Sequence, residues 1–153
     1  MRFVVQVVTE ASVISDGVLT GKIGKGLAVL VGIGPDDDEA VADKMVSKLT
    51  GLRIFKDGEG KTNLSVGDVG GGILLVSQFT LYADVRKGNR PNFINAADPA
   101  MAEKMYDMVV EKVRAVNDNV GTGVFGASMK LSLVNDGPFT VIIDSEDLNI
   151  KRR

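Results

Sequence analysis

The chain has 153 residues, 44% of them hydrophobic and 25% charged, with a formal net charge of −2 and with neither histidine nor cysteine. This length and composition predict one soluble globular domain, and the charge supplies no overall field for nucleic acid, so an RNA contact would need a local patch. The missing residue types exclude a Ser-His-Asp triad, a cysteine nucleophile, an imidazole or thiolate zinc site and a disulfide. An enzyme of this composition must use carboxylates, lysines, hydroxyls, backbone dipoles or groups of its substrate.

Targeting signals are missing from the sequence as well. No apolar run is long enough to span a membrane, and the first residues enter a strand-like sequence without the pattern of a signal peptide. We therefore expect a cytoplasmic protein without a membrane partner. Without a linker or an internal repeat, we expect one domain over residues 1–145, followed by a basic C-terminal tail over residues 146–153.

The first part of the chain predicts strands. Residues 2–8 have strand composition, and residues 11–15 and 18–23 predict a hairpin around Asp16-Gly17. Residues 27–31 form an apolar run between glycines, which is typical of a buried strand.

An acidic run, residues 36–39, is predicted to open the first helix, because carboxylates in a first turn suit the positive end of the helix dipole. The alternative for this run is a cation site, and we favour a solvated helix start. Apolar residues at helical spacing predict the buried face of the helix: Val41, Met45, Leu49 and Leu52.

A second buried strand follows a turn at residues 56–61 and a short strand at residues 63–66. The apolar run Ile73–Val76 comes after three glycines and leads directly into Ser77-Gln78-Phe79-Thr80. Side chains at a strand end in an α/β sheet are often placed where ligands bind. Taken alone, Ser and Thr at a strand end more often satisfy nearby backbone groups, so both interpretations stay open at this point.

A basic loop, residues 82–91, precedes the second predicted helix, which starts at Asp98-Pro99 with proline at its first position. The methionines of this helix are expected to fill the core rather than to bind a ligand. Its predicted buried stripe consists of Met101, Met105, Met108, Val109, Lys112 and Val113.

The last elements are predicted as a strand over residues 129–134, a turn over residues 135–138 and a returning strand over residues 139–144. Strands outnumber helices. We therefore predict an α/β single domain with a curved, mostly antiparallel or mixed, barrel-like sheet covered by two main helices.

The dipeptide Gly137-Pro138 lies between these two strand-like segments. A cis peptide before proline costs only about 0.5–1 kcal/mol relative to trans, and glycine adds freedom at positive φ. Such a dipeptide can aim two successive carbonyl oxygens in one direction, although an ordinary turn is the alternative.

An ordered set of short segments runs through the chain, and no single one of them is specific. They are Ala11-Ser12-Val13, Leu52-Arg53-Ile54-Phe55, Asn63-Leu64-Ser65-Val66, the block Ser77 to Asp84, Arg86-Lys87-Gly88, Arg90-Pro91, Thr122-Gly123, Phe125-Gly126-Ala127, Met129, the block Ser132 to Pro138, and Thr140. With these segments at this spacing, the chain resembles the bacterial and eukaryotic D-aminoacyl-tRNA deacylases over nearly its full length.

The resemblance implies a homodimer with each active site near the subunit interface, acting on the aminoacylated 3′ end of tRNA. We expect no cofactor and assign no metal ligands, and metal dependence stays open. Ser77, Gln78, Phe79 and Thr80 would line the pocket for the terminal adenosine and its ester. Gly137-Pro138, as a cis peptide, would reach into the pocket of the partner subunit and face the α-carbon of the amino acid. The pocket wall would include Phe125, Met129 and Asn135.

The implied reaction is hydrolysis of the ester of D-aminoacyl-tRNA, and also of glycyl-tRNA mischarged on tRNA-Ala. Backbone N–H groups near Phe79 and Thr80 are our candidates for the oxyanion donors, each worth about 2.7–4 kcal/mol. Thr80 as a covalent nucleophile would need an adjacent base. We therefore favour attack by water, assisted by the 2′-hydroxyl of the substrate, with Thr80 orienting water or ester.

Chirality requires a clash, because a methyl-sized difference in a pocket is worth only about 1–3 kcal/mol. The carbonyl oxygens of Gly137 and Pro138 would leave room for hydrogen and exclude an L side chain. A broad range of D side chains, and glycine, would then be accepted.

Arg86, Lys87 and Arg90 are expected to contact acceptor-stem phosphates, with a solvated loop as the alternative. The chain departs from the usual family sequence at Val7, where an arginine is thought to brace the Gly-Pro segment, and at Thr62, where methionine is usual. The first departure puts the rigidity of the chiral filter in doubt, and the second is expected to alter the pocket wall.

Two other functions stay open from the sequence. One keeps the fold as a nucleotide- or aminoacyl-adenosine-binding module without catalysis. The other is a purely structural dimer in which Gly137-Pro138 only fixes the interface.

Overall fold

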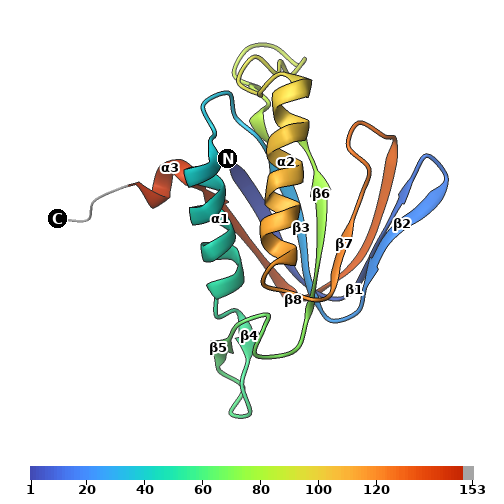
Figure 1. Cartoon of the computed structure of the whole chain (residues 1–153), viewed down its shortest axis with the longest axis vertical. Helices are drawn as coiled ribbons and strands as arrows, with labels where there is room; N and C mark the ends of the chain where they lie inside the picture. Colours follow the sequence, from blue (N-terminus) through green and yellow to red (C-terminus); the bar gives the residue numbers. More distant parts are fainter. Residues whose placement is uncertain (150–153) are drawn as a thin grey trace.

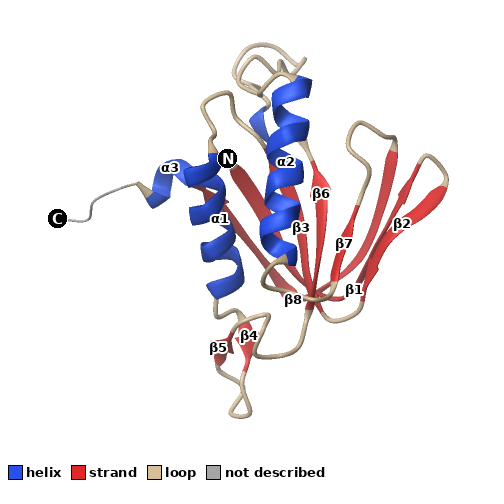
Figure 2. Cartoon of the chain, viewed as in Figure 1, coloured by secondary structure: helices blue, strands red, loops and turns tan. Residues whose placement is uncertain are grey.

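The computed structural model describes residues 1–149, which form one sheet with two main helices on one face (Figure 1). The strands of this sheet are β1 (Arg2–Ser15), β2 (Val18–Ile23), β3 (Gly26–Gly32), β6 (Gly72–Ser77), β7 (Val120–Thr122) and β8 (Met129–Asp144). The other elements are α1 (Glu39–Gly51), α2 (Pro99–Arg114), α3 (Ser145–Leu148), the 3-10 helix η1 (Phe79–Tyr82) and a small hairpin of β4 (Phe55–Lys56) and β5 (Thr62–Leu64) (Figure 2).

The long strand β1 organises the sheet. It pairs antiparallel with β2 and β3 along one edge and with β8 along the other, and β6 and β7 follow β3 in parallel. A Cβ on Gly21 of β2 would lie 2.8 Å from the backbone nitrogen of Thr122 in β7, so the curl of the sheet brings these two strands together. This confirms the predicted α/β single domain with a curved, mixed, barrel-like sheet.

The predicted hairpin at the end of β1 is also confirmed. Asp16 and Gly17 both have positive φ, 47° and 82°, as in the two-residue turns whose twist matches that of the flanking strands. The expected strands at residues 2–8 and 11–15 are two parts of β1.

Both main helices begin where the sequence predicts. Asp38 caps α1 by accepting a hydrogen bond from the Val41 N–H, and Asp98 caps α2, with Pro99 at its first position. The buried face of α1 is shifted slightly from the prediction and consists of Ala42, Met45, Val46 and Leu49. The helix α2 buries Ala102, Met105, Tyr106, Val109, Val110 and Val113, while Met101 and Met108 are partly buried at the edge of the core.

The strand β6 is buried on both faces. Ile73 and Leu75 belong to the main core beneath the helices, and Leu74 and Val76 belong to a second apolar cluster on the other side of the sheet. This explains the unbroken apolar run, because alternate residues of a strand face opposite sides. The polar residues that follow this run are therefore carried on a rigid strand.

The predicted turn at residues 135–138 is wrong. β8 continues in one direction from Met129 to Asp144 and pairs with β1 over its whole length. Val8 pairs with Asn135 and Gln6 with Thr140, so residues 136–139 bulge out opposite Val7 alone. A local bulge absorbs the extra residues, and β1 is long enough to pair with both halves of β8.

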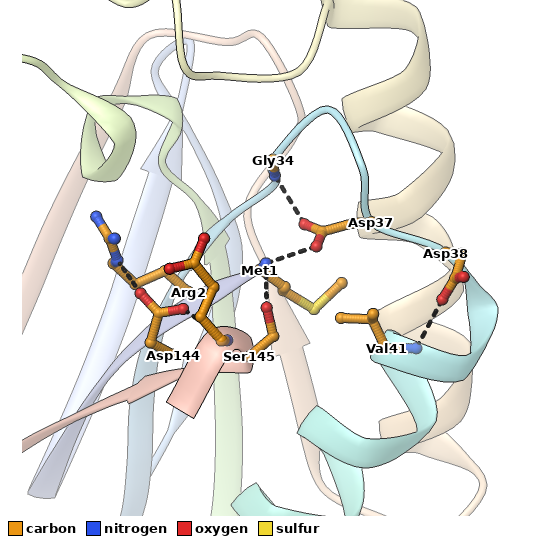
Figure 3. A network of polar contacts seen from close by, with 9 residues as sticks. Met1, Arg2, Gly34, Asp37, Asp38, Val41, Asp144 and Ser145 are labelled. Atoms are coloured by element: carbon orange, nitrogen blue, oxygen red, sulfur yellow. Dashed lines mark hydrogen bonds and ion pairs between the residues drawn. The ribbon is translucent and has the colours of Figure 1, made fainter. Parts of the chain in front are cut away.

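The start of β1 is held by a network of polar contacts (Figure 3). The α-ammonium group of Met1 donates hydrogen bonds to Asp37 at 2.6 Å and to Ser145 at 2.8 Å, and Asp37 also accepts one from the Gly34 N–H at 2.7 Å. The Asp37 side chain is only 7% exposed. The expected solvated helix start is therefore wrong for Asp37, whose carboxylate binds the ammonium group of the chain itself.

Among the described residues, no helix has the length and apolar character needed to cross a membrane. At the C-terminal end, residues 145–148 form α3, and the basic residues 151–153 of the expected tail lie outside the described residues.

Candidate active site

A cavity of about 580 Å³ opens at the carboxyl end of β6. Ser77, Gln78 and Phe79 line it from the end of that strand. Three further parts of the chain complete the wall. They are Phe93 with Ala96, Ala97, Pro99 and Ala102 around the start of α2, then Phe125, Gly126, Ala127, Met129 and Leu131, and last Leu30 with Val76. An apolar cavity with a few polar groups at one side suits a small ligand with an aromatic part.

Two aromatic rings stand at the mouth of the cavity. Phe79 and Phe93 meet edge to face with their centroids 5.0 Å apart, and they are 55% and 37% exposed. Large apolar side chains with this exposure in a cavity offer a surface for a planar ligand.

The cavity wall at Phe125 packs beside a buried tyrosine, Tyr106. The Tyr106 hydroxyl donates a hydrogen bond to the Leu75 carbonyl at 2.8 Å, and its ring lies 6.1 Å from that of Phe125. Burial raises the pKa of Tyr106, so this hydroxyl stays protonated and keeps its hydrogen bond.

The residues after β6 turn into η1 and leave two amide groups free. The Gln78 N–H donates to the Val31 carbonyl at 2.8 Å, but within residues 1–149 no group accepts a hydrogen bond from the N–H of Phe79 or Thr80. Backbone donors of this kind, beside a cavity, can stabilise an oxyanion.

Thr80 is exposed and does not belong to the cavity wall of the single chain. The Gln78 side-chain amide donates a hydrogen bond to its hydroxyl. Because that hydroxyl oxygen accepts from Gln78, its own proton is free to point toward a further acceptor.

Arg2 anchors the far end of η1. Its Nη1 donates to the Leu81 carbonyl at 2.6 Å, its Nε pairs with Asp144 at 2.8 Å, and its guanidinium lies 4.9 Å from the Tyr82 ring centroid. Burial raises the pKa of the Tyr82 hydroxyl, and the nearby Asp37 and Asp144 carboxylates raise it further. No local pattern in the sequence indicates this contact between the first strand and the site.

Of the residues expected in the pocket wall, Phe125 and Met129 line the cavity and Asn135 does not. The Asn135 side chain instead bonds within the bulge of β8, to Phe139 and Thr140. The Gly137–Pro138 peptide bond is cis. Both residues are exposed and lie outside the cavity wall of their own chain.

The expectation that Thr62 alters the pocket wall is not met in the single chain. It lies exposed in the β4–β5 hairpin, at the opposite end of the molecule from η1 and outside the cavity wall (Figure 1). Its departure from the usual methionine therefore leaves the cavity of this chain unchanged.

Of the three cationic side chains expected to contact phosphates, one forms an ion pair and two form none with the described residues. Arg86 holds Asp84 through Nε and Nη2, at 2.9 and 2.7 Å, and this hydrogen bonding keeps the pKa of the Asp84 carboxyl well below its usual range. Lys87 and Arg90 are exposed and form no ion pair with residues 1–149. These two side chains are the stronger candidates for phosphate contacts.

Sequence reasoning missed Phe93, Pro99 and Ala102 in the cavity wall. Phe93 is an isolated apolar residue after the basic loop, Pro99 indicates only a helix start, and Ala102 carries no signal for the cavity. No group of three or more Asp or Glu residues in the part of the chain that the structure describes is arranged to hold a metal ion.

Comparison with known proteins gives concordant matches. A family model described as D-Tyr-tRNA(Tyr) deacylase matches residues 4–144. A D-aminoacyl-tRNA deacylase of Desulfitobacterium hafniense is 57% identical over 146 residues, covering 95% of this chain and 98% of the relative. One of Thermomicrobium roseum is 53% identical over 148 residues, covering 97% and 96%.

Two solved structures share the fold. The structure titled "c-Myc DNA Unwinding Element Binding Protein" is 41% identical with a TM-score of 0.89, covering 94% of this chain and 98% of its own. A probable eukaryotic D-amino acid tRNA deacylase is 22% identical with a TM-score of 0.80, covering 93% and 97%.

Proposed function

This chain belongs to the D-Tyr-tRNA(Tyr) deacylase family, and from that membership we propose that it hydrolyses the ester bond of D-aminoacyl-tRNA, releasing free D-amino acid and tRNA. It is a hydrolase acting on aminoacyl-tRNA esters, and we place its action in the cytoplasm, where aminoacyl-tRNA is used. The observation that carries the proposal is the pair of free amide groups at Phe79 and Thr80, beside a cavity of about 580 Å³.

In the proposed complex, the terminal adenosine of tRNA enters the cavity and its base contacts the rings of Phe79 and Phe93. These rings offer the apolar faces on which nucleobases stack, at about 1–3 kcal/mol per base. The ester carbonyl then lies against the amide groups at the start of η1. Ser77 and Gln78 provide hydrogen-bonding groups at the same edge.

Catalysis in this proposal uses position and backbone dipoles. The chain has no histidine, and Thr80 has a side-chain amide, not a base, bonded to its hydroxyl. A water molecule, assisted by the 2′-hydroxyl of the substrate ribose, attacks the ester carbonyl. The N–H groups of Phe79 and Thr80 stabilise the oxyanion, each by about 2.7–4 kcal/mol, and Thr80 orients the water or the ester.

Selection for the D configuration is assigned to Gly137 and Pro138 of a second copy of the chain. Both residues are exposed on β8 and do not line their own cavity, so they are free to enter the cavity of a partner in a homodimer. Their carbonyl oxygens would leave space for hydrogen on one face of the α-carbon and exclude an L side chain. Glycine has no side chain to exclude, so glycyl-tRNA mischarged on tRNA-Ala is a second proposed substrate.

The acceptor stem is proposed to contact the loop after η1. Lys87 and Arg90 are exposed and unpaired among residues 1–149, while Arg86 is partly neutralised by Asp84. Few contacts of this kind give modest, salt-sensitive binding with little sequence preference.

The decisive experiment compares ester loss from D-Tyr-tRNA and L-Tyr-tRNA with the purified protein. Selective hydrolysis of the D-ester is expected. Protection of the ester without turnover would instead indicate an aminoacyl-adenosine-binding module, and neither effect would indicate a structural dimer. A sedimentation measurement on the same sample tests the homodimer.

A further inference from the structure

We propose that Asn135 is a positioning residue whose side-chain amide holds the bulge at residues 136–139 in shape, so that Gly137 and Pro138 present their carbonyl oxygens in one orientation. The inference rests on the proposed function, in which this dipeptide excludes L-aminoacyl groups. Asn135 does not line the cavity of its own chain, so this role is distinct from the pocket-wall role that the family resemblance implied.

The bulge leaves its backbone largely outside the strand ladder. Val8 pairs with Asn135 and Gln6 with Thr140, so residues 136–139 have only Val7 opposite them. Asp136, Gly137 and Pro138 are exposed. An exposed segment without ladder hydrogen bonds keeps a single shape only if other contacts fix it.

The Asn135 side chain supplies such contacts across the dipeptide. Its Oδ1 accepts a hydrogen bond from the Phe139 N–H at 2.8 Å, and its Nδ2 donates one to the Thr140 Oγ1 at 2.8 Å. One amide group thus joins the residue before the bulge to the two residues after its cis peptide. The bond from the Phe139 N–H is partly buried, which reduces competition from water, whereas the bond to Thr140 is exposed.

We call the two hydrogen bonds of Asn135, with Phe139 and Thr140, the Asn135 clamp. Thr140 connects this clamp to the central strand β1. The Gln6 Nε2 also donates to the Thr140 Oγ1, at the longer distance of 3.4 Å. Val7, at the position opposite the bulge, is 6% exposed, packs in the main core and offers no polar group. Asn135 therefore provides the short hydrogen bonds of the clamp, and Gln6 a weaker one.

Loss of the clamp should relax the dipeptide and so reduce exclusion of the L side chain. The ester carbonyl still meets the amide groups of η1, which the clamp does not touch. Asn135→Ala and Thr140→Val are therefore expected to lower the ratio of kcat/KM on D-Tyr-tRNA to that on L-Tyr-tRNA by about tenfold, the size of one or two hydrogen bonds. The change should come mainly from a faster L reaction.

The experiment measures that ratio for the intact chain and both variants, together with their unfolding midpoints. Thr140→Ser retains the hydroxyl and should restore the ratio. Ser132→Ala, on an exposed position of the same strand, is the matched control for a general effect on β8. Thr140→Val serves as an independent variant if Asn135→Ala fails to fold.

The outcomes distinguish the proposed role of Asn135 from the proposed deacylase function. A selective wild-type protein whose ratio falls in Asn135→Ala and Thr140→Val supports the clamp. An unchanged ratio in folded variants, or equal losses on both substrates, overturns the clamp and leaves the deacylase proposal standing. A wild-type protein without D/L selectivity overturns the assigned role of the dipeptide itself.

Discussion

The ammonium nitrogen of Met1 and the Oδ1 of Asp37 form an ion pair 2.6 Å long, in which the side chains are 0% and 7% exposed (Figure 3). The loop that leads into α1 is thereby fastened to the first residue of β1. Ser145, at the start of α3, accepts a second hydrogen bond from the same nitrogen. Three separate parts of the chain therefore depend on one charged group.

Asp37→Asn should destabilise the fold by about 3 kcal/mol, because removing one partner of a buried ion pair leaves the other charge uncompensated. Urea unfolding at pH 7 measures the change. Asp36→Asn, at an exposed neighbouring position, is the control and should stay within about 0.5 kcal/mol of wild type. Equal effects of the two variants would contradict the importance of the ion pair.

Arg2→Lys tests the anchor of η1. Lysine keeps a positive charge near Asp144 but cannot reproduce the planar fork that contacts both Asp144 and the Leu81 carbonyl. We expect kcat on D-Tyr-tRNA to fall at least about tenfold, because a hydrogen bond to a charged group is worth about 1.5–3 kcal/mol, with little change in KM. Arg2→Lys with an unchanged kcat would show that η1 holds its position without this residue.

Thr80→Ala should lower deacylation about tenfold without abolishing it, because a hydroxyl that orients water or ester contributes about one hydrogen bond. Single-turnover kinetics with saturating protein measures the step directly. Complete loss of activity in a folded variant that still binds substrate would indicate that Thr80 is the nucleophile.

Lys87→Ala and Arg90→Ala should each weaken binding of tRNA and reduce the slope of log K against log salt by about 0.7–0.9, the value for one phosphate contact. Filter binding at several salt concentrations measures the slope. Arg86→Ala should have a smaller effect, since its guanidinium is already bonded to Asp84. A larger effect of Arg86→Ala would place the RNA on the other side of the loop.

The carboxyl of Asp84 should titrate below its ordinary value of 3.8, because the side-chain hydrogen bond from Arg86 favours its charged form. A depressed folded-state pKa means that the pair supports the loop above pH 3.8 and loses this contribution as the pH falls through the folded value. NMR titration of the side-chain carboxyl measures the midpoint. In Arg86→Ala the midpoint should move up toward 3.8, and a midpoint that stays low would assign the shift to other groups.

Local chemistry explains which predictions from the sequence are confirmed. The helix starts at the acidic run 36–39 and at Asp98-Pro99, the Asp16-Gly17 turn and the buried run Ile73–Val76 all depend on residues close together in the chain. The spacing of apolar residues and the preferences of turn-forming residues predict such local features well.

The wrong predictions depend on distant parts of the chain. Residues 135–138 look like a turn because Asn, Asp, Gly and Pro favour turns, yet the length of β1 lets β8 continue past them. The contacts of Asn135 with Phe139 and Thr140 were missed with the bulge itself, because they exist only when residues 136–139 bulge out of a continuous strand. The contact of Arg2 with Leu81 joins positions 79 residues apart, which no local pattern encodes.

Both edges of β1 are paired, one with β2 and β3 and the other with β8. Amide protons in such a central strand exchange with solvent mainly through global unfolding. The bulge on β8 is attached to β1 directly, and the segment that follows β6 is attached through β3 on the other side. Hydrogen exchange should therefore be slowest in β1 and faster in the exposed bulge, whose residues have no ladder partners of their own.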